Sequence, residues 1–182
     1  MSQKRANHKI PLRPIGCPLQ LHFNPLSSDN WRDFEQLFGP GGACGGCWCM
    51  LWRLRHAEYE RNKGESNRRA MKKIIAAGQV PGILAYHQNQ PIGWCAIGPR
   101  EHYSRLQHSR LLQPIDRNPV WSIVCLFIQK AFRRCGVSVA LVRAAVEYAR
   151  ERGASIVESY PVEPKKSSAP DVFLWTGLAS AF

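Results

Sequence analysis

Two arginines and a run of small residues stand between an apolar segment and a long amphipathic one. This loop, RRCGVS, covers residues 133–138. It follows the apolar residues 120–128 and precedes residues 137–149, in which apolar side chains recur at helical spacing. The start of a helix leaves backbone N–H groups unpaired and carries partial positive charge, and both favour a bound phosphate. Gly136 permits close backbone approach and the arginines add forked donors, so the loop is a candidate phosphate site.

The segments around this loop predict a strand–helix–strand unit. Residues 120–128 (VWSIVCLFI) are rich in β-branched and aromatic side chains and too short for a helix, which predicts a buried strand. Gly153 ends the helix, because glycine reaches the left-handed cap at little cost. Residues 155–160 (SIVESY) predict a second strand beside the first, joined by a right-handed crossover. On residue types alone, an ordinary turn with solvated arginines explains the loop equally well.

The spacing of Arg133, Gly136 and Ser138 resembles the acetyl-CoA signature of the GNAT acetyltransferase superfamily, Gln/Arg-x-x-Gly-x-Gly/Ala, in its strand–loop–helix context. Ser138 departs from the usual Gly or Ala, and its hydroxyl either donates to a phosphate oxygen or crowds it. Residues 47–53 (CWCMLWR) resemble a segment of a little-characterised bacterial subgroup of that superfamily. The resemblance implies an α/β fold, the mixed-sheet acyl-CoA N-acyltransferase fold, in which helices flank a central sheet.

The resemblance also implies acetyl-CoA as cosubstrate, bound where the two parallel strands separate. Its pantetheine arm would pair with the main chain of Leu126 and Ile128, and the amide of Leu126 or Phe127 would stabilise the oxyanion. The pyrophosphate would be held by the loop, which consists of Arg133, Arg134, Cys135, Gly136, Val137 and Ser138. In the family's reaction a substrate amine attacks the acetyl thioester directly. A lysine-like amine with a pKa of about 10.4 is almost fully protonated at pH 7, so a base must remove a proton.

Candidate bases are the carboxylates and histidines near this opening. Glu158 lies in the middle of the second strand, where a carboxylate is expensive to bury without a task or a partner. It is therefore the first catalytic candidate, although an exposed glutamate on the sheet face explains it equally well. Tyr160 is the next candidate, followed by Glu101 and His108. The family's thiolate-protonating tyrosine would correspond to Phe182, which has no hydroxyl.

The remaining pattern predicts one domain, because 182 residues suffice for a single core. We expect residues 1–18 to form a basic, flexible tail and residues 19–182 to form the acetyltransferase domain. By the resemblance, the C-terminus is truncated and the last two strands of the family's sheet are missing. A fifth strand with an open edge invites pairing with another chain, which leaves a homodimer open.

Other expected elements lie before the strand–helix–strand unit. They are a strand at 19–23, an amphipathic helix at 29–38, a second helix at 70–77, a hairpin of strands 82–87 and 92–97, and a short helix at 102–107.

The composition is that of a soluble globular protein, with 45% hydrophobic and 21% charged residues. No apolar run reaches the roughly 20 residues that a bilayer requires, and the basic N-terminus lacks the apolar core of a signal peptide. We therefore expect a cytoplasmic protein without membrane contact. A net charge of +12 leaves nucleic acid or an acidic protein open as partners. The alternative function is a non-catalytic binding protein for RNA or an acidic partner, built on a decayed acyltransferase scaffold.

The cysteines of the segment at 44–49 have the spacing C-x-x-C-x-C, at which thiolates can hold zinc. Cys44, Cys47 and Cys49 lack a second such pair to complete four ligands, although His56 is near in sequence. We expect no metal. Seven cysteines are an odd set scattered along the chain, which does not indicate a disulfide framework. We expect Trp48, Met50 and Trp52 to line the core or the wall of a cleft.

Overall fold

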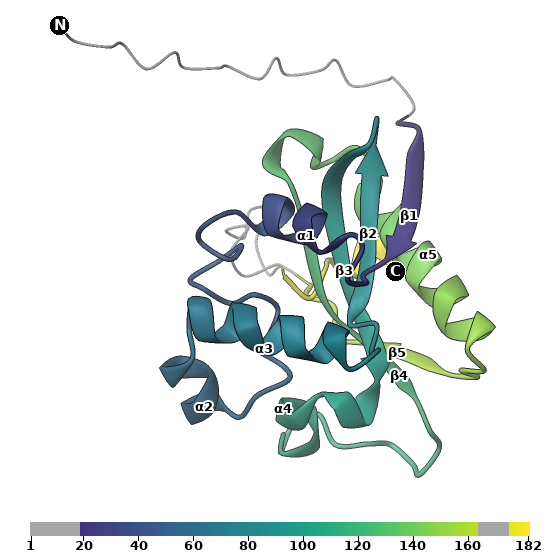
Figure 1. Ribbon diagram of the computed structural model, residues 1–182. Helices are drawn as coiled ribbons and strands as arrows, with labels where there is room; N and C mark the ends of the chain where they lie inside the picture. The colour runs from purple at the N-terminus through teal and green to yellow at the C-terminus, as the bar shows by residue number, and fades with distance from the viewer. Residues whose placement is uncertain (1–18, 164–174) are drawn as a thin grey trace, which may run out of the picture.

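A single mixed sheet of five strands forms the centre of the molecule in the computed structural model (Figure 1), in the order β1-β2-β3-β4-β5. The structure describes residues 19–163 and 175–182. The strands are β1 (Leu21–Pro25), β2 (Gly82–His87), β3 (Gln90–Pro99), β4 (Trp121–Ile128) and β5 (Val157–Ser159). The strands β1 to β4 pair with one another antiparallel, and β5 pairs parallel to β4. The expected α/β fold with a mixed sheet is confirmed.

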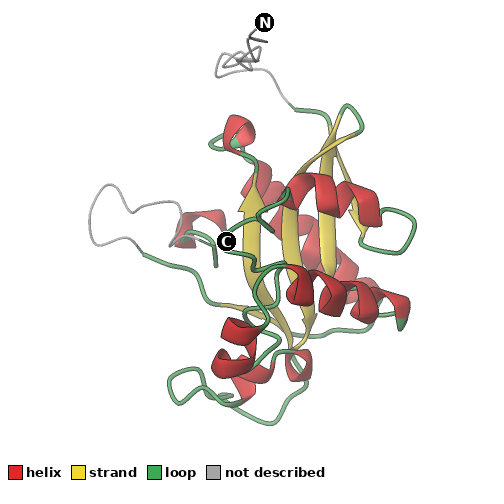
Figure 2. Cartoon of the chain, turned by 60° about the vertical axis from the view of Figure 1, so that its left-hand side comes forward, coloured by secondary structure: helices red, strands yellow, loops and turns green. Residues whose placement is uncertain are grey.

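Helices cover both faces of this sheet, as Figure 2 shows. The α-helices are α1 (Trp31–Phe38), α2 (His56–Arg61), α3 (Glu65–Ala76), α4 (Ser104–Gln107) and α5 (Val137–Glu151). Short 3₁₀ turns are η1 (Arg100–His102), η2 (Lys130–Phe132) and η4 (Ala179–Ala181). Residues of α1 and α3 belong to the core on one face, and residues of α5 belong to the core on the other. None of the helices in the described part is long and apolar enough to cross a bilayer.

The two faces of the sheet carry different cores. The face under α1 and α3 is aromatic, with Phe34 packed between Phe38 and Trp94 at ring-centroid distances of 4.0 and 4.9 Å. The face under α5 is aliphatic, and Leu141 and Ala145 of that helix are completely buried there. Most of the helical stripe that the sequence predicts in α5 therefore packs on the sheet, whereas Ala140 and Ala144 of that stripe are only partly buried.

The turn between β2 and β3 is short because its two residues adopt left-handed backbone angles. Gln88 and Asn89 have φ values of 49° and 60°. Two positive-φ residues characterise the type I′ turn, whose twist matches that of the strands it joins. The expected hairpin is confirmed, and β3 extends on both sides of the predicted 92–97.

A β-bulge interrupts β4 opposite β3. Ala96 pairs with Cys125 and the next residue, Ile97, pairs with Ile123, so Val124 is the extra residue. Val124 and Cys125 consequently face the same aromatic core, whereas Ile123 and Leu126 face the α5 core. The bulge shifts the alternation of the strand by one residue and thereby sets the direction in which the end of β4 presents its groups.

Pairing between β4 and β5 covers only the beginning of β4. The register joins Trp121 to Val157, Ser122 to Glu158 and Ile123 to Ser159, after which β5 ends. β4 continues to Ile128 without pairing to β5. The strand–helix–strand unit expected from the sequence is confirmed, with a shorter second strand than the predicted 155–160. The tail expected at 1–18 lies outside the described residues.

Candidate active site

The loop between β4 and α5 presents the start of the helix to solvent. Gly136 is the N-cap residue with φ 75° and ψ 1°, and no side chain caps the helix there. Arg134 also has a positive φ, 61°. Both residues are exposed, while Val137 packs into the core and anchors the first turn. The first amides of the helix therefore point out of a left-handed turn, which is the arrangement that binds phosphate oxygens.

Arg133 is held close to the end of β4, since its Nε donates to the carbonyl of Ile128 at 3.1 Å. The Cys135 thiol turns back onto the same loop and donates to the Arg133 carbonyl at 3.4 Å. Arg134 carries its charge at the exposed surface beside them. The loop thus carries two arginines just before α5, one held against the end of β4 and one at the exposed surface.

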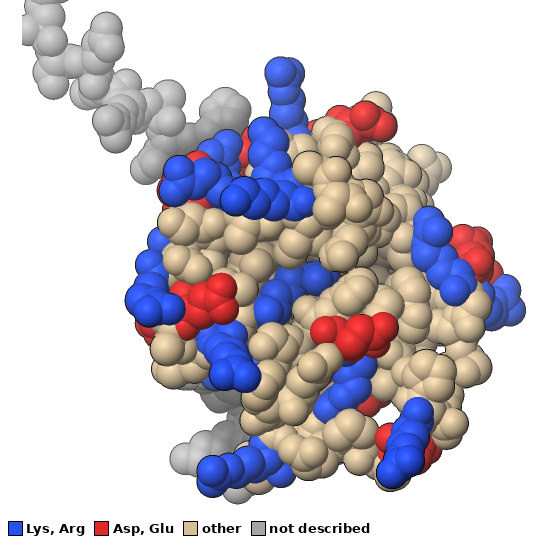
Figure 3. Space-filling model, turned by 60° about the horizontal axis from the view of Figure 1, so that its bottom comes forward, with Lys and Arg blue, Asp and Glu red and all other residues tan. Residues whose placement is uncertain are grey.

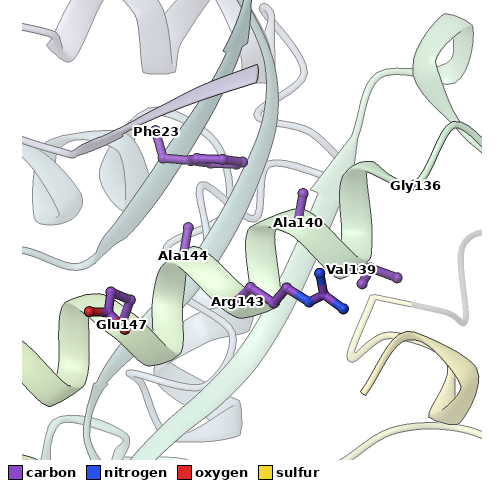
Figure 4. A pocket seen from close by; sticks show the side chains of 7 residues that line it. All are labelled: Phe23, Gly136, Val139, Ala140, Arg143, Ala144 and Glu147. Carbon is purple, nitrogen blue, oxygen red and sulfur yellow. The ribbon is translucent and has the colours of Figure 1, made fainter. Parts of the chain in front are cut away.

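An open groove of about 680 Å³ begins at this loop and follows the outer surface of α5. Figure 4 shows Gly136 at one end of it and Glu147 at the other, with the ring of Phe23 from β1 opposite the helix. Ala140 and Ala144 keep the helix surface low between them. The groove shares Gly136 with the loop, so a molecule held by the loop has apolar surface beside it.

Beyond the last pair of β4 and β5, the described residues 175–182 approach β4. The amide of Leu126 donates to the carbonyl of Trp175 at 2.5 Å. A Cβ on Gly177 would lie 2.8 Å from Leu126 Cδ1, so the two segments are in close contact. Val162, after β5, also donates to the Gly177 carbonyl at 2.8 Å. The opening expected between the strands exists, and near Leu126 it is filled by residues of the same chain.

The backbone N–H groups of β4 point alternately toward β3 and away from it. Because Leu126 directs its N–H away from β3, its neighbour Phe127 directs its own toward β3, and Ile128 points again to the side of Leu126. Of the two oxyanion donors expected from the resemblance, this geometry favours Leu126. It also places the main chain of Leu126 and Ile128 on one side, where both can pair with an extended ligand.

Glu158 sits in a compact polar cluster at the paired end of β4. Its Oε1 accepts hydrogen bonds from Arg100 Nη1 at 2.5 Å, from Ser122 Oγ at 2.5 Å and from the Tyr160 hydroxyl at 2.6 Å. Arg100 also donates to the Tyr160 oxygen, at 2.5 Å, and to the carbonyl of Leu112. The side chain of Arg100 is 10% exposed and that of Glu158 is 26% exposed. The two catalytic candidates are therefore in direct contact, and Glu158 has the partner that its burial requires.

The cluster sets the protonation of both candidates. Burial raises the pKa of Glu158, but hydrogen bonds from Ser122, Tyr160 and Arg100 together outweigh it, so the pKa is lowered. Burial, followed by the hydrogen bond to Glu158, raises the pKa of Tyr160. Glu158 is consequently ionised and Tyr160 protonated at neutral pH. All three hydrogen bonds to Glu158 reach Oε1, and Oε2 has no hydrogen-bond partner among the described residues.

Sequence reasoning missed Arg100 and Ser122, which complete this cluster. Ser122 lies within the apolar run of β4 and is fully buried, so its hydroxyl must hydrogen-bond to a group of the protein. Arg100 directly follows β3, where a buried cation was not expected. Glu101 and His108, the further candidate bases, are exposed, and no hydrogen bond joins either of them to Glu158 in the described part.

The segment at 47–53 forms a wall beside the cluster. The Trp52 ring stacks on that of Tyr160 at a centroid distance of 6.2 Å. Trp48 and Met50 are buried in the aromatic core, as the sequence predicts. Trp48 and Cys49 have φ values of 45° and 57°, which side chains other than glycine rarely adopt. The segment is held in this conformation by the core and presents Trp52 at its edge.

The cysteines of this segment are spread over different environments. Cys44 is exposed, Cys47 is half-buried and Cys49 is buried, where its sulfur accepts a hydrogen bond from Trp94 Nε1 at 3.1 Å. Within residues 19–163 and 175–182, no three His, Cys, Asp or Glu side chains gather as they would around a metal ion.

Comparison with known proteins places this geometry in a family. A family model described as "Acetyltransferase (GNAT) family" matches residues 48–169. None of the curated proteins compared with the chain is significantly similar to it. Among solved structures, the aminoglycoside N-acetyltransferase AAC(6')-Iy in complex with CoA has a TM-score of 0.51 and 16% identity, over 85% of this chain and 83% of that one.

Two other solved structures are similar at lower TM-scores. Acinetobacter haemolyticus AAC(6')-IG, an aminoglycoside 6'-N-acetyltransferase, has a TM-score of 0.48 and 19% identity, over 79% of this chain and 81% of that one. A GCN5-related N-acetyltransferase from Ralstonia eutropha JMP134 has a TM-score of 0.48 and 14% identity, over 82% and 97%. The family match covers more than half of the sequence and includes β4, the loop at residues 133–138 and α5. The chain therefore belongs to the acetyltransferase (GNAT) family and is an N-acetyltransferase.

Proposed function

We propose that the protein transfers the acetyl group of acetyl-CoA to a primary amine by direct attack of that amine on the thioester. The observation that carries the proposal is the continuity of three features along β4. The exposed helix start with its two arginines follows Ile128, the outward amide of Leu126 precedes it, and the Glu158 cluster lies at the paired end of the strand. These features suit, in that order, a pyrophosphate, an acyl thioester and an ammonium group.

Acetyl-CoA binds with its pyrophosphate on residues 133–138, where the helix amides and the charges of Arg133 and Arg134 meet its oxygens. Its pantetheine arm runs along the unpaired part of β4 and reaches the main chain of Ile128 and Leu126. Because the Leu126 amide already donates to Trp175, binding exchanges that carbonyl for one of the ligand. In the transition state the same amide faces the oxygen on which negative charge develops.

Glu158 and Tyr160 serve the amine. The carboxylate is ionised at neutral pH, and its Oε2 is the atom left for a substrate ammonium or for water. A carboxylate with a lowered pKa holds a proton weakly, so its part is to attract the ammonium and to order the water that carries its proton away. Tyr160 keeps its own proton and orients the carboxylate. The nitrogen then bonds to the acetyl carbon and gives up its second proton, the C–S bond breaks, and coenzyme A leaves as a thiolate that takes up a proton.

The direct test measures coenzyme A release with a thiol reagent across a panel of amines that includes polyamines, peptides, free lysine and aminoglycosides. Calorimetry with acetyl-CoA tests the loop separately. Gly136→Glu should abolish binding, because it brings a carboxylate against the phosphates. Gly136→Asn is the matched control, since asparagine tolerates the left-handed angle and adds no charge. Equal binding by wild type and Gly136→Glu contradicts the phosphate site.

The alternative, a basic protein that binds RNA or an acidic partner, rests on the net charge of +12. Figure 3 shows one face of the molecule, on which Lys and Arg side chains lie in separate groups with Asp and Glu between them. A face of this kind offers no continuous basic track for a phosphate backbone. Salt-sensitive RNA retention together with no coenzyme A release from any amine would favour the alternative.

A further inference from the structure

A second cavity lies between α3, the segment at 47–53 and η1. Its residues are remote in the sequence from residues 133–138, the proposed phosphate loop. Its volume is about 390 Å³, which suits a small molecule. Its apolar lining consists of Met50, Leu54, Ala70 and Ile74. Its polar lining consists of Arg53, Lys73, Gln79 and His102. We call it the basic cavity, because none of the residues that line it is acidic.

Arg53 is the buried cation of this cavity. The residue is 8% exposed, and its guanidinium lies over the Tyr103 ring at 4.9 Å. Nη2 donates to the carbonyl of Pro81 at 3.3 Å, while Nε is buried and has no hydrogen-bond partner among the described residues. A buried charge that lacks an opposite charge is strongly unfavourable, and so is a buried donor without an acceptor. An anion bound beside Arg53 would offset both unfavourable contributions.

The protein itself offers Arg53 little compensation. No described Asp or Glu forms an ion pair with it. The Cys49 thiol is near enough to interact with Arg53 electrostatically, but its sulfur already accepts the hydrogen bond of Trp94. The contrast with Arg100 is direct, because that arginine is buried to a similar extent and is fully paired with Glu158.

Of the other polar residues that line the cavity, Lys73 adds a second positive charge. Lys73 and Gln79 are exposed, and His102 is half-buried. Burial, followed by the charge of Arg53, lowers the pKa of His102, whereas the neighbouring Glu101 acts in the opposite direction. His102 is thus close enough to Arg53 to respond to its charge, and it will respond to any anion that neutralises that charge.

We propose that the basic cavity binds a small molecule through a carboxylate or phosphate group, with Arg53 as its buried partner and Lys73 at its entrance. The apolar residues Met50, Leu54, Ala70 and Ile74 receive the rest of the ligand. The site is independent of the phosphate loop, because the two share no lining residue. It gives this chain a second anion-binding site beside the one proposed for acetyl-CoA.

The test uses NMR of histidine ring carbons in the full-length protein, with His102 as the local reporter. His102→Gln identifies its resonance among the six histidines. Inorganic phosphate and glutarate are titrated separately, each against sodium chloride at equal ionic strength. A saturable shift of the His102 resonance with phosphate alone assigns a phosphate ligand, and a shift with glutarate alone assigns a carboxylate. If neither anion moves this resonance beyond the effect of chloride, the proposal is wrong.

Three variants locate the binding. Arg53→Met keeps an apolar side chain and removes the charge. It should reduce the affinity for the anion at least about tenfold, the usual range for a lost hydrogen bond to a charged group. Lys73→Gln changes an exposed side chain of the cavity lining and should reduce the affinity for the anion several-fold. Lys72→Gln is the matched control, since it removes the same charge one position away, outside the cavity lining. Equal affinities for wild type, Arg53→Met and Lys73→Gln contradict the proposal.

Measurements of acetyl-CoA binding show whether a negative result concerns the basic cavity or the proposed acetyltransferase function. Calorimetry on Lys73→Gln should give the wild-type affinity for acetyl-CoA. In the reverse experiment, Gly136→Glu should lose acetyl-CoA and retain the anion-dependent shift of His102. Loss of both responses in Gly136→Glu, in a protein that still unfolds cooperatively, would show one shared site and overturn the proposal.

Discussion

The amide nitrogen of Leu126 lies 2.5 Å from the carbonyl oxygen of Trp175. The bond joins the unpaired half of β4 to the described residues 175–182, across the opening that β5 leaves when it ends at Ser159. The proposed oxyanion donor is thus satisfied within the chain before any ligand arrives. In the proposed complex the thioester carbonyl and the Trp175 carbonyl compete for one N–H, so we expect the position of residues 175–182 to control how readily acetyl-CoA binds.

Substitution of Gly177 tests this competition. Gly177 has φ +88°, and an added Cβ would lie 2.8 Å from Leu126 Cδ1 and 2.9 Å from Phe182 Cε2. Gly177→Ala should therefore displace the segment, at a cost of about 1–2 kcal/mol from the backbone angle alone. We expect calorimetry to show acetyl-CoA binding up to about tenfold tighter, because the competing state is less stable.

Gly153→Ala is the control for backbone strain, since Gly153 has a similar φ of +82° with no atom near its added Cβ. It should leave the affinity for acetyl-CoA unchanged. Weaker binding by Gly177→Ala alone would mean that residues 175–182 contribute to the acetyl-CoA site instead of competing for it.

Substitution of Glu158 tests the polar cluster in both stability and catalysis. Glu158→Gln leaves the buried Arg100 without its opposite charge, which should reduce the free energy of unfolding by about 2 kcal/mol. Denaturant unfolding measures this loss. Below the unfolding temperature, kcat should fall more than the affinity for acetyl-CoA, because the substitution acts on the amine. Glu60→Gln breaks the exposed pair with Lys63 and should change neither quantity.

The pH dependence of stability follows from the lowered pKa of Glu158. A carboxylate with a lowered pKa in the folded state stabilises the protein above its unfolded pKa, about 4.3, and loses that contribution as pH falls through the folded value. The difference in unfolding free energy between wild type and Glu158→Gln should therefore be constant near pH 7 and shrink below about pH 4. A difference that grows in acid would contradict this account of the cluster.

Thiol labelling offers a test of the phosphate loop without any amine. Cys44 and Cys135 are exposed, and only Cys135 belongs to the loop. Acetyl-CoA should slow the modification of Cys135 and leave that of Cys44 unchanged, as peptide mass spectrometry after brief labelling would show. Equal protection of both thiols, or of neither, would contradict the placement of the pyrophosphate.

The sequence predicted the elements whose pattern is local. The expected limits of β4 and α5 lie within about two residues of the observed ones. A β-branched run and a helical stripe of apolar residues are patterns that can be read from residues close together in the sequence. Gly136 and Gly153 were expected at the two ends of α5, where both have positive φ. The helix α2 was missed, since its six residues contain a single buried side chain, Tyr59, and no stripe.

The sequence could not predict contacts between distant segments. Arg100 and Glu158 are 58 positions apart, and only the pairing of β3 with β4 and of β4 with β5 brings them together. The approach of Trp175 to Leu126 is of the same kind. Glu158 could be suspected from its place in a strand, whereas its partner required the fold.

The bulge at Val124 decides which amides of β4 face away from β3. If pairing ran regularly past Ile123, Leu126 would lie opposite Trp94 instead of Cys95, so its side chain would leave the α5 core and its N–H would point at β3. The strand can exchange one apolar side chain for another and still direct the same amide outward. A strand of the same length that paired without the bulge would offer the thioester a different backbone group, so the extra residue at Val124 sets the chemistry at the end of β4.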